Sequence, residues 1–498
     1  MKKIFSFLLI AIIAVVASIS FVGCSNNELE KVSKNLTSYA ITAELNDEKK
    51  TISAIEKISF LNDTGDVLEF LCFHLYPRAF REGALVKPYT QLNEATCFPA
   101  GVSFGDINIV DVYVDNKTAE FELVGQDEDI LKVDLGFNLE RQAKTNIEIK
   151  FNLILPNSTH RFGWYENNIN LGNWYPILCI YENGEFDLTP YFSTGDPFYS
   201  NIANYDVTVL YPEKYEISST GSLNIIKDGE YATAKINALA VRDFAICLSS
   251  NSKIETTSLN GIEISYMSCI DDEDFLTIVQ IAREAIEFFS TIFGQYPYKT
   301  LTVAKTPFLY GGMEYPNLVF VSNSIDSKEE LYKVVVHEIA HQWWYGIVGN
   351  NEIKEAWLDE SLAEYSTALF FDSHKNYGIT YDELISQAMS SYLLYVDVVS
   401  TIRGDVNTQM DLAVNEYQND YEYSYMVYIK GVIMFDSLKN MVGKDKVVAG
   451  LKKYFRENKF KNATKLDFFE AFKTACHKDL NGFFEGFLDG STIISNIN

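Results

Sequence analysis

The chain has 498 residues, and its 47% hydrophobic and 14% aromatic content is enough for a large packed core, which excludes a disordered protein. This length exceeds one typical domain core and predicts two or more domains. The formal net charge of −27 argues against binding to nucleic acid, because contacts to a phosphate backbone require basic patches.

The first 24 residues have the pattern of a targeting segment. Lys2 and Lys3 precede a nearly continuous apolar run from Ile4 to Val22. This run and the cysteine after it resemble a bacterial lipoprotein signal, in which Cys24 is the lipidated first residue of the mature chain. An uncleaved membrane anchor is the alternative, since a run of about nineteen apolar residues can span a bilayer. Both interpretations predict a membrane-anchored protein outside the cytoplasm, and the first predicts a bacterial lipoprotein.

The region from residue 25 to 255 is predicted to hold a tether and then a β-rich domain. Residues 25–38 are polar, whereas residues 51–60 alternate apolar and polar side chains and end at a turn signal, Asn62-Asp-Thr-Gly65. Many short strands separated by turn signals are typical of a β-sandwich. We therefore predict a β-sandwich-like domain over 39–255, with further strands near 107–114, 119–124, 129–134, 145–154, 205–211 and 231–250.

Near Asp272 the periodicity becomes helical, first over 274–289. Strands are predicted at 301–306 and 318–321, and Ser327-Lys-Glu-Glu330 has the capping-box pattern that opens a helix. Later helices are predicted over 354–372, 381–396, 422–442, 444–457 and 466–474. Residues 256–498 are thus predicted to form a mostly α domain with a small sheet, which makes the chain an α+β multidomain protein.

A metal-binding pattern lies in this second domain. His337 and His341 stand four residues apart, so on a helix they share one face and can bind one Zn²⁺. Glu338 between them can act as a base toward water at the metal. A catalytic zinc needs a third protein ligand, and Glu360 can supply it from a facing helix. The chain has only 6 histidines, so an accidental motif is improbable and one Zn²⁺ per chain is expected.

Glu364 lies one helical turn beyond Glu360. From there it can accept the other ring N–H of His337 and fix the tautomer of this ligand. A solvent-exposed glutamate fits the sequence equally well. The histidines of the β-rich region, His74 and His160, are interpreted as structural.

Three motifs occur in order, and together they resemble the M1 family of zinc aminopeptidases, the gluzincins, which includes aminopeptidase N and leukotriene A4 hydrolase. They are Gly311-Gly-Met-Glu-Tyr315, the H-E-x-x-H motif at 337–341, and Trp357-Leu-x-Glu360. Segments such as Asn173-Trp-Tyr-Pro176 and Val241-Arg-Asp-Phe244 are similar to the family's N-terminal domain. The resemblance implies a thermolysin-like catalytic domain over 256–498 and peptide substrates with a free N-terminus.

The resemblance also implies a role for each motif residue. The three predicted metal ligands match the family's zinc ligands, and Glu338 matches its general base. Glu314 matches the carboxylate that holds the α-ammonium of the substrate, which suits the need of a buried cation for a paired anion. Gly311 and Gly312 suit a strand edge that approaches the substrate backbone closely. The tyrosine that donates to the oxyanion matches Tyr428, in Tyr-Ile-Lys-Gly431, rather than Tyr423.

Three departures from the family pattern are visible. Tyr315 replaces an asparagine after Glu314, and Asp359 replaces an asparagine before Glu360. The chain also ends soon after the catalytic domain, so a more open cleft is expected.

The predicted function is that of a zinc-dependent metalloaminopeptidase that hydrolyses N-terminal residues from peptides outside the cytoplasm. A zinc endopeptidase is the alternative if Glu314 points away from the site. A peptide-binding envelope lipoprotein with a structural metal is the other alternative, but a structural site has no use for the base Glu338.

Overall fold

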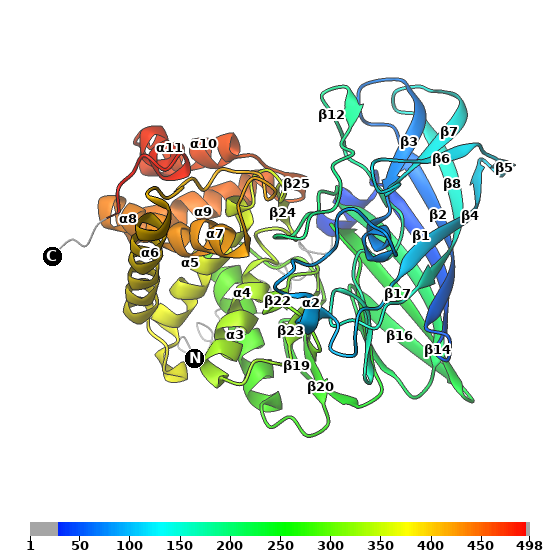
Figure 1. The fold of residues 1–498 in the computed structure, drawn as a ribbon, viewed down its shortest axis with the longest axis horizontal. Coiled ribbons are helices and arrows are strands. Elements are labelled where there is room, and N and C mark those ends of the chain that lie inside the picture. The colour runs from blue at the N-terminus through cyan, green and yellow to red at the C-terminus, as the bar shows by residue number, and fades with distance from the viewer. Residues whose placement is uncertain (1–27, 495–498) are drawn as a thin grey trace, which may run out of the picture.

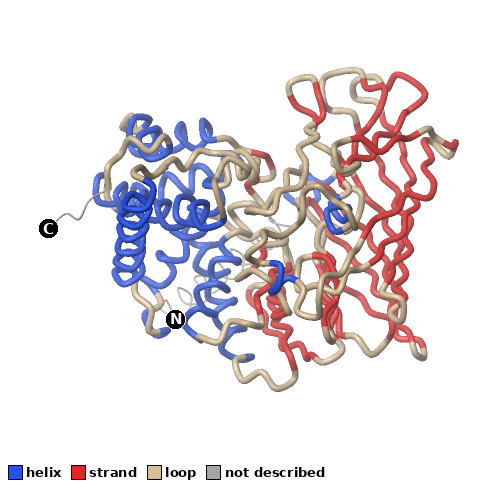
Figure 2. The backbone as a smooth tube through the Cα atoms, viewed as in Figure 1, coloured by secondary structure: helices blue, strands red, loops and turns tan. Residues whose placement is uncertain are grey.

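The computed structural model describes residues 28–494 and has a sheet-rich N-terminal region followed by a mostly helical C-terminal region (Figures 1 and 2). This arrangement confirms the predicted α+β class. The predicted signal segment 1–24, with Cys24, lies outside the described residues. Within the described part of the chain, no helix is long and apolar enough to cross a membrane.

The largest element of the N-terminal region is an eight-stranded sheet. Its order is β16 (Ser222–Asp228), β17 (Tyr231–Val241), β14 (Ala203–Pro212), β1 (Ser38–Asn46), β2 (Thr51–Leu61), β8 (Lys144–Ile154), β4 (Asp106–Val114) and β5 (Lys117–Thr118). Only β1 and β14 pair in parallel, with Ser38 opposite Asn204, and the other pairs are antiparallel. Buried and exposed residues alternate along β2, as its sequence predicts, so one face of the sheet packs into the core.

Two four-stranded sheets complete the region. One has the order β15 (Glu216–Ser219), β18 (Ile246–Ser249), β10 (Asn168–Leu171) and β9 (Phe162–Tyr165). The other has the order β11 (Ile177–Leu178), β3 (Leu68–His74), β7 (Ile130–Leu139) and β6 (Phe121–Val124). The short elements β12 (Tyr181–Glu182), β13 (Glu185–Phe186), η1 (Tyr76–Phe80) and α2 (Glu94–Cys97) lie in the connections.

The structure differs from the prediction at two places in this region. Part of the predicted tether packs onto the fold: residues 28–33 are helical, and Leu29 is buried because it joins the hydrophobic core. The predicted strand 231–250 is broken into β17 and β18, since Ala240 adopts a φ of 53° and the buried polar residues Arg242 and Asp243 follow it.

The second region opens with a five-stranded sheet of order β19 (Ser252–Leu259), β20 (Ile262–Cys269), β21 (Thr300–Thr306), β23 (Leu318–Ser322) and β22 (Gly312–Met313). Because β19 pairs along its whole length with β20, this sheet begins a few residues before the predicted boundary at 256. The strands β24 (Val348–Gly349) and β25 (Lys461–Asn462) form a separate small pair.

Helices make up the rest of the second region. They are α3 (Phe275–Ile292), α4 (Lys328–Ala340), α5 (Trp357–Ser373), η2 (Lys375–Tyr377), α6 (Tyr381–Arg403), α7 (Asp420–Ser424), η3 (Tyr425–Ile429), α8 (Lys430–Val442), α9 (Lys444–Asn458), α10 (Lys465–Cys476) and α11 (Asn481–Leu488). The predicted helix 422–442 is thus three elements, because a π-helical turn, η3, separates α7 from α8. The helices α4 and α5 contact each other and bring the H-E-x-x-H motif opposite Glu360.

Candidate functional site

Helix α4 carries the first two predicted ligands. Ser327 caps it by accepting a hydrogen bond from the backbone N–H of Glu330, and the apolar residues Val335 and Ile339 are buried on its inner side. His337 lies in the last turn of the helix, and His341 follows its end. The ring Nδ1 of His341 lies 2.9 Å from the carbonyl oxygen of Trp344. A neutral ring that donates this bond leaves the Nε2 lone pair free for a metal.

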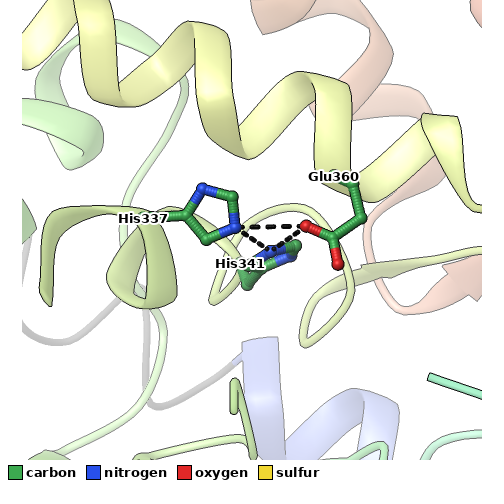
Figure 3. A group of neighbouring side chains, drawn as sticks. All are labelled: His337, His341 and Glu360. Carbon is green, nitrogen blue, oxygen red and sulfur yellow. Dashed lines mark hydrogen bonds and ion pairs between the residues drawn. The ribbon is translucent and has the colours of Figure 1, made fainter. Parts of the chain in front are cut away.

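The three predicted zinc ligands converge on one point (Figure 3). The Nε2 atoms of His337 and His341 are 3.0 Å apart, and each lies 3.1 Å from Oε2 of Glu360. All three side chains are buried. Burial alone would raise the pKa of Glu360, but the two imidazoles hold it well below its usual range. Two imidazoles and one carboxylate are the donor set of many catalytic zinc sites, so the residues present fit a zinc ion.

Glu338 lies beside this set, and a glycine leaves the room for its side chain. It is buried, and burial raises the pKa of Glu338 to about 7, although His337 and His341 oppose the shift. A Cβ atom on Gly312 would lie 2.2 Å from Oε1 of Glu338, whereas a Cβ on Gly311 would meet only Val334, at 3.6 Å. Position 312 must therefore be a glycine to leave room for the side chain of Glu338, the predicted base. Both glycines line the same cavity.

Two further predicted residues contact the ligands. Oε1 of Glu364 lies 3.2 Å from Nδ1 of His337, near the position that the sequence suggested for an orienting carboxylate, but the two atoms are not aligned for a hydrogen bond. The hydroxyl of Tyr428 donates a hydrogen bond to Oε1 of Glu360, and its ring stacks on His337. Tyr423 is also buried and lines the cavity, but its hydroxyl forms no hydrogen bond to a metal ligand, and its ring lies 5.8 Å from that of Tyr428. The π-helical turn η3 carries Tyr428 into this position.

Glu314 points into the same cavity. It is 3% exposed, and its Oε1 has no hydrogen-bond partner. Burial and repulsion from Asp196 raise the pKa of Glu314 well above its usual range. The amide Nε2 of Gln342 donates to the backbone carbonyls of Glu314 and Tyr315, at 3.3 and 3.2 Å, which ties this segment to the end of the H-E-x-x-H motif.

Neither of the two residues that depart from the family pattern lines the cavity. The hydroxyl of Tyr315 donates to Oδ1 of Asn173 at 2.9 Å, and a Cβ on Gly172 would lie 1.9 Å from this hydroxyl. The larger side chain of Tyr315 thus occupies space that Gly172 leaves. Asp359 accepts a hydrogen bond from Asn350, and burial together with Glu360 raises the pKa of Asp359 to about 7.

One residue of the site was missed by sequence reasoning. Asp196 lies in the loop between β13 and β14, and its carboxylate is within 4.8 Å of those of Glu314 and Glu360. Nη1 of Arg161 donates to Asp196 at 2.7 Å, and Arg161 is itself buried. The only sequence signal was the Gly-Asp-Pro turn pattern at 195–197, which predicts a loop and gives no indication of where it folds.

The metal-binding set surrounds one cavity of ≈ 590 Å³ together with Glu338, Glu314, Asp196 and Tyr428. Its walls come from loops of the N-terminal region, from β22, and from α4, α5, α6 and η3. The N-terminal region supplies Asp196 and Arg161, and the C-terminal region supplies the metal-binding set. The site is therefore built where the two regions meet.

The fold and the site together define a two-region protein with the architecture and ligand set of a zinc metallopeptidase. The profile of the peptidase family M1 domain matches residues 278–487, so this part of the chain is similar to that family. This confirms the resemblance seen in its motifs.

Comparison with individual proteins supports this assignment. The chain is 25% identical to aminopeptidase N of Lactobacillus helveticus over 404 residues, which cover 77% of this chain and 46% of that protein. It is 28% identical to aminopeptidase N of Lactobacillus delbrueckii subsp. lactis over 253 residues, which cover 47% of this chain and 29% of that protein. The chain thus spans less than half the length of these curated relatives.

A solved structure has the same fold over almost the whole chain. The M1 zinc metallopeptidase of Deinococcus radiodurans superposes with a TM-score of 0.66 and 13% identity, over 93% of this chain and 95% of that one. A mutant of that protein has been crystallised with the substrate Tyr-Ser-Ala. At this level of identity the likeness shows the shared fold.

Proposed function

We propose that this chain is a zinc-dependent aminopeptidase that removes the first residue from peptides with a free N-terminus. The observation that carries the proposal is the position of Glu314, a buried carboxylate with an unpartnered oxygen, in the same cavity as the His337, His341 and Glu360 set. A buried anion of this kind is stabilised by a cation. The free α-ammonium of a peptide provides that cation.

The chain's own residues account for the steps of hydrolysis. His337, His341 and Glu360 would hold the zinc ion, which when bound polarises the scissile carbonyl and lowers the pKa of water. Glu338 takes the proton from the attacking water and passes it to the leaving amine. The Tyr428 hydroxyl donates a hydrogen bond to the developing oxyanion.

The carboxylates of Glu314 and Asp196 bind the N-terminal ammonium group of the substrate. Their oxygens lie within 4.8 Å of each other, so one ammonium group can contact both. A peptide that continues past this point, or whose amine is acetylated, places no positive charge there and leaves the Glu314 carboxylate unpaired, whereas Asp196 keeps its ion pair with Arg161. This argues against the zinc endopeptidase, which was the alternative if Glu314 pointed away. The buried base Glu338 argues against a purely structural metal site.

The activity test compares free and blocked substrates. We expect the zinc-loaded protein to release the fluorophore from a panel of aminoacyl coumarylamides and not from their N-acetyl forms, and to lose activity with a chelator. Glu338→Gln should retain zinc and lose turnover, whereas Glu314→Gln should mainly raise KM. Equal cleavage of acetylated and free substrates would refute the exopeptidase assignment.

We also propose that the protein acts outside the cytoplasm and is anchored to a membrane through residues 1–24. The support is the sequence pattern alone, a basic start, an apolar run and Cys24. A Cys24→Ala variant in a bacterial host should no longer incorporate labelled fatty acid and should change its membrane fraction. Unchanged labelling in this variant would refute lipidation at Cys24.

A further inference from the structure

The cavity has a second acidic group close to the residues that hold the substrate's amine. Asp420, the first residue of α7, lines the cavity and is half-buried. The catalytic steps proposed above do not use it. Because Asp420 lines the cavity, it can contact a bound substrate.

Asp420 is held by neutral donors only. Its Oδ2 accepts hydrogen bonds from Thr90, at 3.1 Å, and Asn93, at 3.3 Å, and its Oδ1 accepts one from Thr194, at 2.7 Å. A carboxylate has about four acceptor positions, so Oδ1 has one free. No lysine or arginine of residues 28–494 forms an ion pair with Asp420, so its negative charge has no cationic partner.

The location of Asp420 is at the end of the cavity where the amine is held. Thr194, which binds Asp420, is two residues from Asp196, which lies beside Glu314. The same loop borders the cavity at Tyr310, whose hydroxyl donates to the backbone carbonyl of Ser193, next to Thr194, at 3.4 Å. Asp420 thus lines the same cavity as Glu314 and Asp196 and is joined by Thr194 to the loop that carries Asp196.

The charges at this end of the cavity favour a cationic side chain. Two basic side chains, Arg161 and Lys333, line the cavity, and each is paired with its own carboxylate, at 2.7 Å in both cases. One α-ammonium lies between Glu314 and Asp196 and leaves the charge of Asp420 unpaired. A lysine or arginine as the first residue adds a second positive charge, and this charge can reach the free acceptor of Oδ1.

We infer that Asp420 forms the floor of the pocket for the first side chain and selects peptides that begin with lysine or arginine. This inference rests on the proposed aminopeptidase function. It names a residue and a substrate class for that activity. Because Asp420 is held by three hydrogen bonds from two other segments, it is ordered before the substrate binds, and little conformational entropy is lost on binding.

The test uses pairs of substrates that differ in charge and little in shape. Coumarylamides of lysine and norleucine, and of arginine and citrulline, are cleaved by the zinc-loaded full chain. We expect kcat/KM to be at least tenfold higher for the charged member of each pair. Asp420→Asn keeps the size of the side chain and most of its bonds, and it should reduce this ratio to within threefold of one.

A matched control is available in Asp445→Asn. Asp445 also lies in the first turn of a helix, α9, but it is exposed and does not line the cavity. This variant should keep the charged-to-neutral ratio of the wild type. Circular dichroism of each variant verifies its folding.

The possible results separate this inference from the proposed function. Cleavage of norleucine and citrulline substrates as fast as their charged partners refutes the role of Asp420 while the aminopeptidase proposal stands. An Asp420→Asn variant that loses activity equally on all substrates also refutes the role of Asp420 in substrate selection. That result indicates that Asp420 only holds the structure together through its hydrogen bonds. Cleavage of no free-amine substrate by the zinc-loaded wild type refutes the aminopeptidase proposal itself.

Discussion

The space next to Gly312 provides a sharp test of the proposed base. A Cβ atom at this position would lie 2.2 Å from Oε1, 2.4 Å from Cδ and 2.6 Å from Cγ of Glu338. Ordinary contact begins at 3.4 Å, so the carboxylate must move by about 1.2 Å in Gly312→Ala. A displacement of about 1 Å in a catalytic group can lower the rate roughly 10²-fold. We therefore expect kcat to fall about a hundredfold.

The same substitution should change stability little. The obstructing atoms belong to a side chain that can rotate, and Gly312 has no positive φ that would strain an alanine. We expect the free energy of unfolding to change by less than about 1 kcal/mol, within the range of mild substitutions. Zinc content should be unchanged, because the three atoms nearest to the added Cβ all belong to Glu338 and none to a metal ligand.

Gly311→Ala is the matched control, because its Cβ would meet only Val334 at an ordinary 3.6 Å. Steady-state kinetics on a free-amine coumarylamide, zinc analysis and urea unfolding of both variants give the comparison. If Gly312→Ala keeps kcat within threefold of the wild type, or if both variants lose activity equally, then Glu338 is not held as the base in this position.

Three further predictions follow from the site and its surroundings. Tyr428→Phe removes the hydroxyl proposed to donate to the oxyanion, and steady-state kinetics should show kcat reduced about 10²–10³-fold with little change in KM. Glu364→Ala removes the carboxylate at Nδ1 of His337 and should weaken zinc affinity about 10–100-fold in a competition with a chelator. Burial raises the pKa of Asp243 from 3.8 to about 6, so the folded state of the metal-free protein binds this proton more tightly than the unfolded state. The stabilisation is complete below pH 4 and is lost as the pH rises through 6, and it is of the order of 3 kcal/mol. Urea unfolding of the metal-free wild type and Asp243→Asn should show this pH dependence only in the wild type, and parallel curves would contradict it.

Local sequence features predicted the parts of the molecule that depend on local periodicity. The alternation along β2 and the capping pattern at Ser327 each correspond to an observed element, because the spacing of buried side chains follows from backbone geometry. The metal-binding set could also be found from sequence, since the four-residue spacing brings His337, in the last turn of α4, and His341, at its C-cap, onto one side. The π-helical turn η3 could not, because one extra residue in a helical turn leaves the pattern of apolar residues almost unchanged.

The contribution of the N-terminal region to the site depends on contacts that are distant in sequence. Asp196 lies more than a hundred residues before Glu314, in a loop with no periodic pattern, and only the packing of the two regions brings their carboxylates together. The same holds for Tyr315 and Gly172, whose fit explains why a tyrosine replaces the family's asparagine. A substitution of this kind is explained only by the packing around the side chain, which the local sequence does not show.

The position of the site between the two regions has a physical consequence for selectivity. The groups proposed to carry the chemistry, Glu338 and Tyr428, belong to the C-terminal region, whereas Asp196 comes from the N-terminal region. A buried junction fixes their separation: the hydroxyl of Tyr315 bonds Asn173 at 2.9 Å, and the amide of Asn173 bonds Asp243 at 2.6 Å. Because interior packing tolerates little displacement, the distance from the amine-binding carboxylates to the metal-binding set is constant. Under the proposed function, a constant distance permits only the first peptide bond to reach the base, which is what removal of one residue at a time requires.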